Sequence, residues 1–160
     1  GATNMLRIGG KNAAALCLLG DILKGFIAVL LAKILGLSIG ALGWVALAAV
    51  AGHMFPVFFQ FKGGKGIATL FGAIFAISLY LGILCLIIWI AVAGITRFSS
   101  LASLSATAAM LVFGYFFTGS GSILLPFLLI TGLIAWRHQE NIQRLLSGSE
   151  NKIDLKRFGQ

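Results

Sequence analysis

The residues of this chain best suited to chemistry lie in one loop that follows an apolar run, HMFPVFFQ, at positions 53 to 60. The loop contains Lys62, Gly63, Gly64, Lys65 and Gly66. Its glycines can adopt backbone angles closed to other residues, so that successive N–H groups can converge on one small anion. The two lysines add positive charge, and the apolar sequence from Ile67 predicts a helix whose N-terminus also favours an anion. The pattern predicts a phosphate-binding loop, with a short turn between membrane helices as the alternative.

Polar residues near both ends of the chain occur in pairs spaced three positions apart, which places each pair on one face of a helix. Asn4 and Arg7 could hold one ligand together, or could anchor the chain at a membrane interface. His138 and Asn141, with Glu140 between them, open a basic tail and could instead belong to a solvated helix end.

Five further polar residues lie in or beside apolar segments. Ser100 and Ser103 share a face, and their alternative role is to let two helices approach closely. Asp21 and Lys24 lie deep in an apolar segment, and we predict an ion pair between them rather than contact with a substrate. We expect His53 to be a packed, hydrogen-bonded group rather than a ligand.

The elements that position these residues must be membrane helices. Of 160 residues, 59% are hydrophobic and the mean hydropathy is +1.04, which excludes an ordinary soluble core. The net charge of +8 comes from basic residues at the edges of apolar runs, a pattern of cytoplasmic membrane loops rather than of a nucleic-acid surface. Cys17 and Cys85 lie within apolar segments without metal-ligand spacing, so we expect neither a disulfide nor a metal site.

Apolar runs predict one all-α polytopic membrane domain over residues 1–160, with about six transmembrane or re-entrant helices. The run from Ile67 to Ile95 is longer than the roughly 20 residues that one crossing needs. If every basic loop faces the cytoplasm, this run must form a hairpin, and we predict its break near Ser78 to Tyr80. The predicted segments are Ala13–Leu35 (with Lys33 reaching the far interface), Ala41–Phe59, Ala68–Ile77, Leu81–Ile95, a span entered through Arg97–Ser105 and ending near Phe117, Ile123–Trp136, and a basic cytoplasmic tail at 137–160.

Four sequences occur in order along this small membrane chain: GATNMLR, GHMFPVFFQFKGGKG, RFSSLAS and RHQENIQRLLSGSENK. Together they resemble the PlsY family of bacterial acyl-phosphate:glycerol-3-phosphate acyltransferases, from Gly1 to about Ile153. The resemblance implies seven transmembrane helices in a full-length chain, so that one helix and a Ser-Asn pair of the first motif would precede Gly1. It implies an inner-membrane enzyme with a cytoplasmic active site, which transfers a fatty acyl group from acyl phosphate to the sn-1 hydroxyl of glycerol 3-phosphate and forms lysophosphatidic acid for phospholipid synthesis.

The resemblance also implies the residues of the site. Arg7 matches a phosphate ligand, Lys65 the charged partner of the glycine loop, and Ser103 a serine that holds glycerol 3-phosphate; Glu140 matches a residue of structural role. The implied substrate-binding residues are Thr3, Asn4, Arg7, Lys62, Gly63, Gly64, Lys65, Gly66, Ser103, His138 and Asn141. The implied partners are acyl phosphate, glycerol 3-phosphate and membrane lipids, without metal, soluble cofactor, nucleic acid or obligatory protein partner.

The sequence contains no evident general base for this reaction. Its carboxylates are Asp21, Glu140, Glu150 and Asp154, and it has no GxSxG nucleophile elbow. An acyl phosphate is an activated mixed anhydride, so a phosphate oxygen, with a second pKa of about 6, can take the hydroxyl proton while the enzyme aligns the substrates. The alternatives are a small transporter, which the scarcity of midplane polar groups disfavours, and a non-catalytic protein that binds lipid phosphates.

Overall fold

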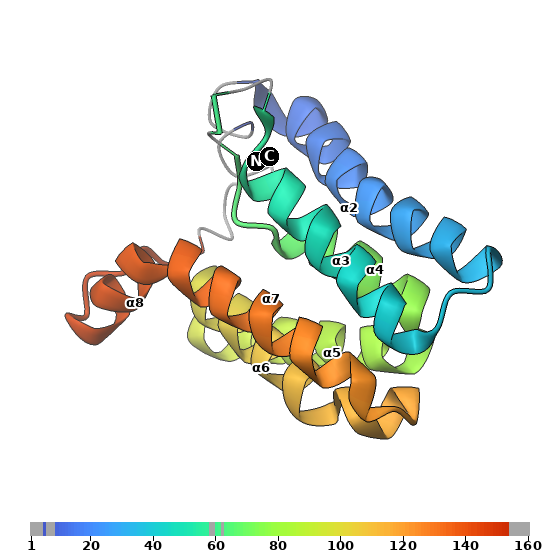
Figure 1. Cartoon of the computed structure of the whole chain (residues 1–160). Coiled ribbons are helices and arrows are strands. Elements are labelled where there is room, and N and C mark those ends of the chain that lie inside the picture. The colour runs from blue at the N-terminus through green and yellow to red at the C-terminus, as the bar shows by residue number, and fades with distance from the viewer. Residues whose placement is uncertain (1–4, 6–8, 58–59, 62, 154–160) are drawn as a thin grey trace.

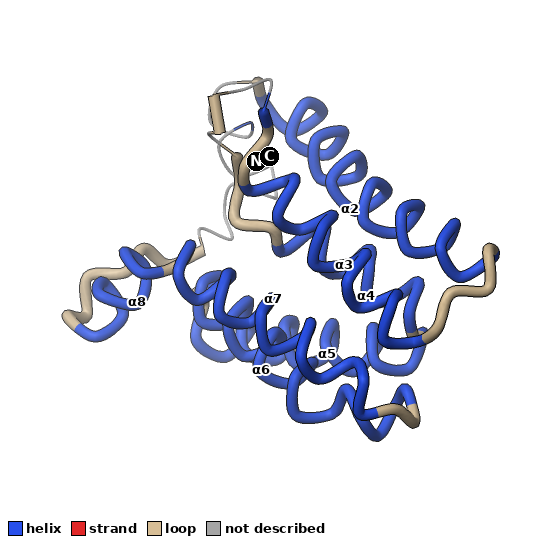
Figure 2. The backbone as a smooth tube through the Cα atoms, viewed as in Figure 1, coloured by secondary structure: helices blue, strands red, loops and turns tan. Residues whose placement is uncertain are grey.

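The computed structural model describes residues 5, 9–57, 60–61 and 63–153, and every regular element within this part is a helix (Figures 1 and 2). Three of these helices are long and apolar enough to cross a membrane, and Gly121–Arg137 with Gln139–Leu146, bent by 64°, make a fourth if the two count as one span. This confirms the predicted all-α membrane fold. The helices are α2 (Gly10–Ile34), α3 (Ile39–Met54), α4 (Ile67–Ile77), α5 (Leu79–Thr96), α6 (Ser99–Thr118), the short 3-10 helix η2 (Gly121–Ile123), α7 (Leu124–Arg137) and α8 (Gln139–Leu146).

The apolar hairpin predicted between Ile67 and Ile95 is confirmed. Helix α4 ends at Ile77 and α5 begins at Leu79, with Ser78 in an extended conformation (φ −147°, ψ 116°). The Ser78 hydroxyl accepts a hydrogen bond from the backbone N–H of Leu81 at 3.4 Å, which satisfies a donor at the start of α5. A serine in an otherwise apolar run therefore ends one helix and caps the next.

The predicted end of the second span at Phe59 is wrong, because α3 ends at Met54. The next residue, Phe55, has non-helical angles (φ −124°, ψ 59°) and precedes Pro56. The proline ring disfavours helical angles in the residue before it, so the helix stops there. Residues 63–66, which precede α4, are drawn as a loop in Figure 2.

Helix α2 packs closely on α4, and both contact α3. A Cβ atom on Gly25 would collide with the carbonyl of Thr69, and one on Gly72 with the carbonyl of Ile22. The helix axes can therefore approach only because these positions lack side chains. Helices α5, α6 and α7 form the other part of the bundle, joined to the first through α4–α5 and α3–α7 contacts (Figure 1).

Lys33, predicted to reach the membrane interface, also makes hydrogen bonds to a neighbouring helix. Its Nζ donates to the carbonyl oxygens of Ala76 at 3.0 Å and Ile77 at 3.2 Å. These carbonyls belong to the last turn of α4, where no backbone donor within the helix is left for them. Lys33 therefore caps α4 from the neighbouring helix and holds the far ends of α2 and α4 together.

Candidate phosphate-binding site

The glycine loop, residues 63–66, leads directly into α4, as the sequence predicts. Gly66 caps the helix in the left-handed conformation at φ +82°, which favours glycine. A Cβ atom on Gly63 would collide with the carbonyl of His53, and one on Gly64 with the His53 ring. The glycines are thus required by the close approach of the loop to the end of α3.

One expectation about this loop needs correction. The backbone N–H of Gly63 donates to the carbonyl of Met54 at 3.2 Å, so it does not face an anion. Within the described part of the chain, the N–H groups of Gly64, Lys65 and Gly66 donate to no acceptor. The first N–H groups of α4 also have no acceptor within the helix. Together with the three loop N–H groups, they are the donors available to an anion.

Arg137, at the end of α7, holds the other side of the loop. Its Nη2 donates to the carbonyl oxygens of Gly63 at 2.8 Å and Gly64 at 3.3 Å. Its guanidinium lies 5.9 Å from the ring centre of Phe55 and 5.7 Å from that of Trp136. By engaging two loop carbonyls, Arg137 partly neutralises their negative charge beside the loop's N–H groups.

Lys65 joins the loop to the C-terminal tail. Its Nζ donates to Oδ1 of Asn141 at 2.5 Å, across 76 positions of sequence. Burial lowers the pKa of Lys65, and the neighbouring Arg144 and Arg137 lower it further, against the opposing effect of Glu150. A phosphate bound beside Lys65 would raise this pKa again, because an opposite charge favours the ammonium form.

His138 lies between α7 and α8 and is only 2% exposed. Its Nδ1 is 2.9 Å from the carbonyl of Ile134, which can only accept, so Nδ1 carries a proton. Burial lowers the pKa of His138, and the charge of Lys65 adds to this effect. The neutral ring then has an unprotonated Nε2, which can accept a hydrogen bond from a hydroxyl group.

Glu150 organises the tail around these residues, a role that the sequence did not indicate. Its Oε1 accepts hydrogen bonds from Ser100 at 2.6 Å and Asn141 at 2.7 Å, and its Oε2 accepts from Arg144 Nε at 2.8 Å. Burial raises the pKa of Glu150, but these three donors together bring the pKa below its ordinary value. A buried carboxylate thus orients Asn141 toward Lys65.

The remaining predicted residues are arranged differently. Ser103 donates to the carbonyl of Ser99 at 2.8 Å and accepts from Trp89 Nε1 at 3.1 Å, so it lies in the α5–α6 contact. Glu140 is 80% exposed and approaches Arg144 at 3.6 Å. Thr3, Asn4, Arg7 and Lys62 lie outside the described residues.

Asp21 and Lys24 form the predicted ion pair, with Lys24 Nζ 2.6 Å from Asp21 Oδ1. His53 is hydrogen-bonded at the same point, as predicted, because its Nδ1 is bonded to Lys24 Nζ, with Asp21 Oδ1 3.3 Å from the same nitrogen. The sequence predicted the pair from its spacing, whereas the contact with His53 spans 29 positions and had no local signal. The same holds for Arg137, which reaches the loop across more than 70 positions.

Comparison with known proteins gives a consistent result. A model of the family described as glycerol-3-phosphate acyltransferase matches residues 1–148. The chain is 46% identical over 155 residues to a glycerol-3-phosphate acyltransferase of Coxiella burnetii (strain RSA 493 / Nine Mile phase I), covering 97% of this chain and 80% of the relative. It is 50% identical over 156 residues to a glycerol-3-phosphate acyltransferase of Francisella tularensis subsp. novicida (strain U112), covering 98% and 76%.

Two solved structures are also similar, and both are crystal structures of PlsY, an integral membrane glycerol 3-phosphate acyltransferase. The lysophosphatidic acid form has a TM-score of 0.90 and 39% identity, covering 100% of this chain and 83% of that one. The glycerol 3-phosphate form has a TM-score of 0.89 and 40% identity, covering 96% and 78%.

Proposed function

Because the chain belongs to the glycerol-3-phosphate acyltransferase family, we propose that its glycine loop, Lys65 and the tail residues His138 and Asn141 bind the phosphate groups of its substrates. The chain is an integral membrane enzyme that acylates glycerol 3-phosphate in phospholipid synthesis. We place the site at the cytoplasmic face of the bacterial inner membrane. The clustering of basic residues at that end of the bundle supports this orientation, since cytoplasmic membrane loops carry an excess of lysine and arginine.

We propose acyl phosphate as the acyl donor. The single observation that carries this proposal is a site rich in donors for phosphate, whose buried carboxylate is already occupied by three hydrogen bonds. Glu150, the carboxylate nearest to Lys65 in the hydrogen-bond network, already accepts from Ser100, Asn141 and Arg144. Both substrates would then carry a phosphate group, and cationic and N–H donors bind such groups strongly.

The proposed reaction needs alignment more than activation. The sn-1 hydroxyl oxygen of glycerol 3-phosphate attacks the carbonyl carbon of the acyl phosphate, and a carbon–oxygen ester bond forms. The bond from that carbon to the phosphate oxygen breaks, and inorganic phosphate leaves with the hydroxyl proton. Holding two phosphates in fixed positions supplies much of the rate by proximity, and Lys65 stabilises the charge that gathers on the leaving phosphate.

The residues outside this described cluster complete the proposed contacts. We assign Thr3, Asn4, Arg7 and Lys62 to the phosphate groups and Ser103 to glycerol 3-phosphate, as the family resemblance implies. For Ser103 this assignment requires its hydroxyl to exchange its bond with Trp89 or Ser99 for one with the substrate. Membrane lipids surround the helices and receive the product.

The test is lysophosphatidic acid formation by purified protein, with glycerol 3-phosphate and either palmitoyl phosphate or palmitoyl-CoA. We expect product from palmitoyl phosphate alone, and a loss of at least a hundredfold in Lys65→Ala. Lys33→Ala is the matched control, because Lys33 caps the far end of α4 and should leave turnover unchanged. Product from palmitoyl-CoA would refute the donor assignment. No product from either donor would favour a transporter or a non-catalytic lipid-phosphate-binding protein.

A further inference from the structure

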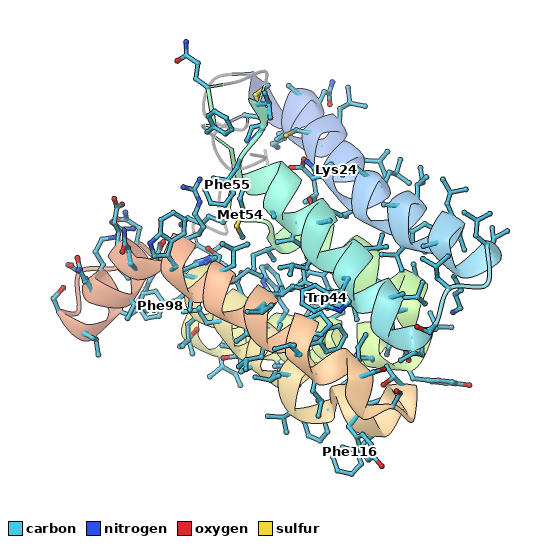
Figure 3. All side chains as sticks on the ribbon, in the orientation of Figure 1. Lys24, Trp44, Met54, Phe55, Phe98 and Phe116 are labelled. Carbon is cyan, nitrogen blue, oxygen red and sulfur yellow. The ribbon has the colours of Figure 1, made fainter. Side chains whose placement is uncertain are left out.

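A second cluster of charged groups lies beside the glycine loop and has no part in the proposed binding of phosphate. It consists of Asp21 and Lys24 on α2 and His53 at the end of α3. Lys24 Nζ lies 2.6 Å from Asp21 Oδ1 and is hydrogen-bonded to His53 Nδ1, and Cys17 Sγ lies 3.8 Å from the other carboxylate oxygen. Figure 3 labels Lys24 on α2, and Met54 and Phe55 at the end of α3 from which the chain enters the loop.

The contacts favour one position for the proton of His53. Nδ1 lies near two groups: Asp21 Oδ1, which only accepts, is 3.3 Å away, whereas Lys24 Nζ, which only donates, is closer. We therefore assign Nδ1 as the acceptor from Lys24 and as unprotonated. The neutral ring therefore carries its proton on Nε2. This assignment makes the cluster of Asp21, Lys24 and His53 electrically neutral, which is the least costly state in an apolar surrounding.

The ring of His53 also touches the glycine loop. Its Nε2 occupies the space where a Cβ atom of Gly64 would lie, while its backbone carbonyl occupies that space at Gly63. One residue thus contacts the loop through both its side chain and its backbone. Its side chain is 9% exposed, so the ring is confined between α2 and the loop.

Helix α2 is fixed relative to the other end of the loop as well. Gly25, next to Lys24, lies against the carbonyl of Thr69 in the first turn of α4. The Asp21–Lys24 pair therefore has a fixed position along the axis of α4, the helix that follows the loop. A displacement of the His53 ring would be transmitted to Gly64 and to its neighbour Lys65.

We propose that His53 is a positioning residue for the glycine loop, and that Asp21 and Lys24 act through it by fixing the orientation and the tautomer of its ring. The inference rests on the proposed function, in which the loop binds substrate phosphate. Loss of the ring should weaken binding of the phosphate-bearing substrates, because the loop donors no longer converge. The rate of the chemical step should change little once substrate is bound, because Asp21, Lys24 and His53 are not proposed to contact the reacting atoms.

The first test separates KM from kcat. We expect His53→Ala to raise the KM for glycerol 3-phosphate or palmitoyl phosphate at least tenfold, with kcat within about threefold of wild type. His53→Gln should restore part of the loss, because its amide nitrogen can lie near the position of Nε2. Lys33→Met is the control for removal of a lysine from α2, and its KM should be that of wild type.

A double-mutant cycle tests whether Lys24 acts through His53. Lys24→Met should raise KM in the wild-type background and have no further effect in His53→Ala, because coupled residues are not additive. Equal effects of Lys24→Met on KM in both backgrounds would overturn the proposal that Lys24 acts through His53. An unchanged KM in His53→Ala would overturn the positioning role itself.

The second test measures the tautomer of His53 and does not depend on enzymatic activity. The sequence has two histidines, so protein labelled with nitrogen-15 histidine gives a spectrum of only His53 and His138. We expect the proton of His53 on Nε2 and that of His138 on Nδ1. In Lys24→Met, Asp21 remains 3.3 Å from His53 Nδ1 and should draw the proton to that nitrogen. A wild-type His53 protonated on Nδ1, or no change in Lys24→Met, would refute the network.

The two tests also distinguish this inference from the proposed function. An inactive wild-type protein with the expected tautomers would refute the function and leave the network in place. An active wild-type protein in which His53→Ala keeps its KM would refute the inference alone. Lys24→Met retains the ring, so it provides the tautomer measurement even if His53→Ala fails to fold.

Discussion

Replacement of Glu150 should show how far the C-terminal tail stabilises the site. Its carboxylate is 6% exposed and accepts hydrogen bonds from Ser100, Asn141 and Arg144. Glu150→Gln keeps one oxygen as an acceptor for Ser100 and Asn141 but presents an amide N–H₂ group to Arg144, which can only donate. Glu150→Ala removes all three acceptor contacts.

The magnitude follows from the number of bonds lost. Hydrogen bonds to charged groups contribute about 1.5–3 kcal/mol each in buried surroundings. The Arg144 side of Glu150 is open to water, since that arginine is 38% exposed, and this screening reduces the sum. We expect a loss of about 2 kcal/mol for Glu150→Ala and about 1 kcal/mol for Glu150→Gln. For a chain of this size these values correspond to about 4–8 °C and 2–4 °C in Tm.

The assay is thermal unfolding in detergent, followed by tryptophan fluorescence across a range of pH. The folded protein holds the pKa of Glu150 below its unfolded value, so its contribution is complete above an unfolded pKa of about 4.3 and is lost as the pH falls through the folded pKa. Glu150→Gln lacks this titrating group. The difference in Tm between wild type and Glu150→Gln should therefore narrow below about pH 4.

Two results would refute this account of Glu150. The first is a Tm for Glu150→Ala equal to that of wild type at neutral pH. The second is a difference between wild type and Glu150→Gln that stays constant as the pH falls. Turnover provides an independent check, because Asn141 loses its contact with Glu150 in the alanine variant, and the KM for glycerol 3-phosphate should rise.

Three further predictions concern the loop and its supports. Gly64→Ala places a methyl group against the His53 ring, so the KM for glycerol 3-phosphate should rise at least tenfold; Gly132→Ala, with nothing within 4 Å, is the control and should keep the wild-type KM. Because burial lowers the pKa of Lys65, turnover should fall with rising pH before the usual lysine value of 10.5, and Lys65→Arg should move this limb to higher pH; identical pH profiles would contradict this. Lys33→Met should lower stability by about 1 kcal/mol, measured as Tm, with turnover unchanged; an unchanged Tm would show that the cap is not stabilising.

Local signals in the sequence predicted most of the helices and the start of the site. The break at Ser78 followed from the length of the apolar run, and the helix after Gly66 followed from a glycine loop leading into apolar residues. The end of α3 was misplaced because the apolar residues continue past Pro56, and hydropathy outweighed the backbone constraint that proline imposes. The Asp21–Lys24 pair was predictable because its members are neighbours on one helix.

The contacts that complete the site could not be predicted in this way. Arg137 meets the glycine loop, and Lys65 meets Asn141, only after α7 has packed beside α3. Glu150 follows Ser147, Gly148 and Ser149, a stretch typical of a solvated turn, so its burial had no signal in the sequence. Spacing along a chain reports neighbours on one element, and these residues become neighbours only through the tertiary fold.

The attachment of the tail at Arg97 has a consequence for synthesis of the protein. Arg97, in the left-handed conformation at φ 62°, accepts from the backbone N–H of Ile153 at 2.7 Å and donates from its side chain to the Ile153 carbonyl at 2.9 Å. Ribosomes add roughly 5–20 residues per second, so the tail emerges several seconds after Lys65. During that interval the nascent chain has an inserted glycine loop without its tail partners. A ribosome that stalls before Glu150 should therefore leave a membrane-inserted but inactive chain, so the enzyme becomes competent only after the tail has been translated.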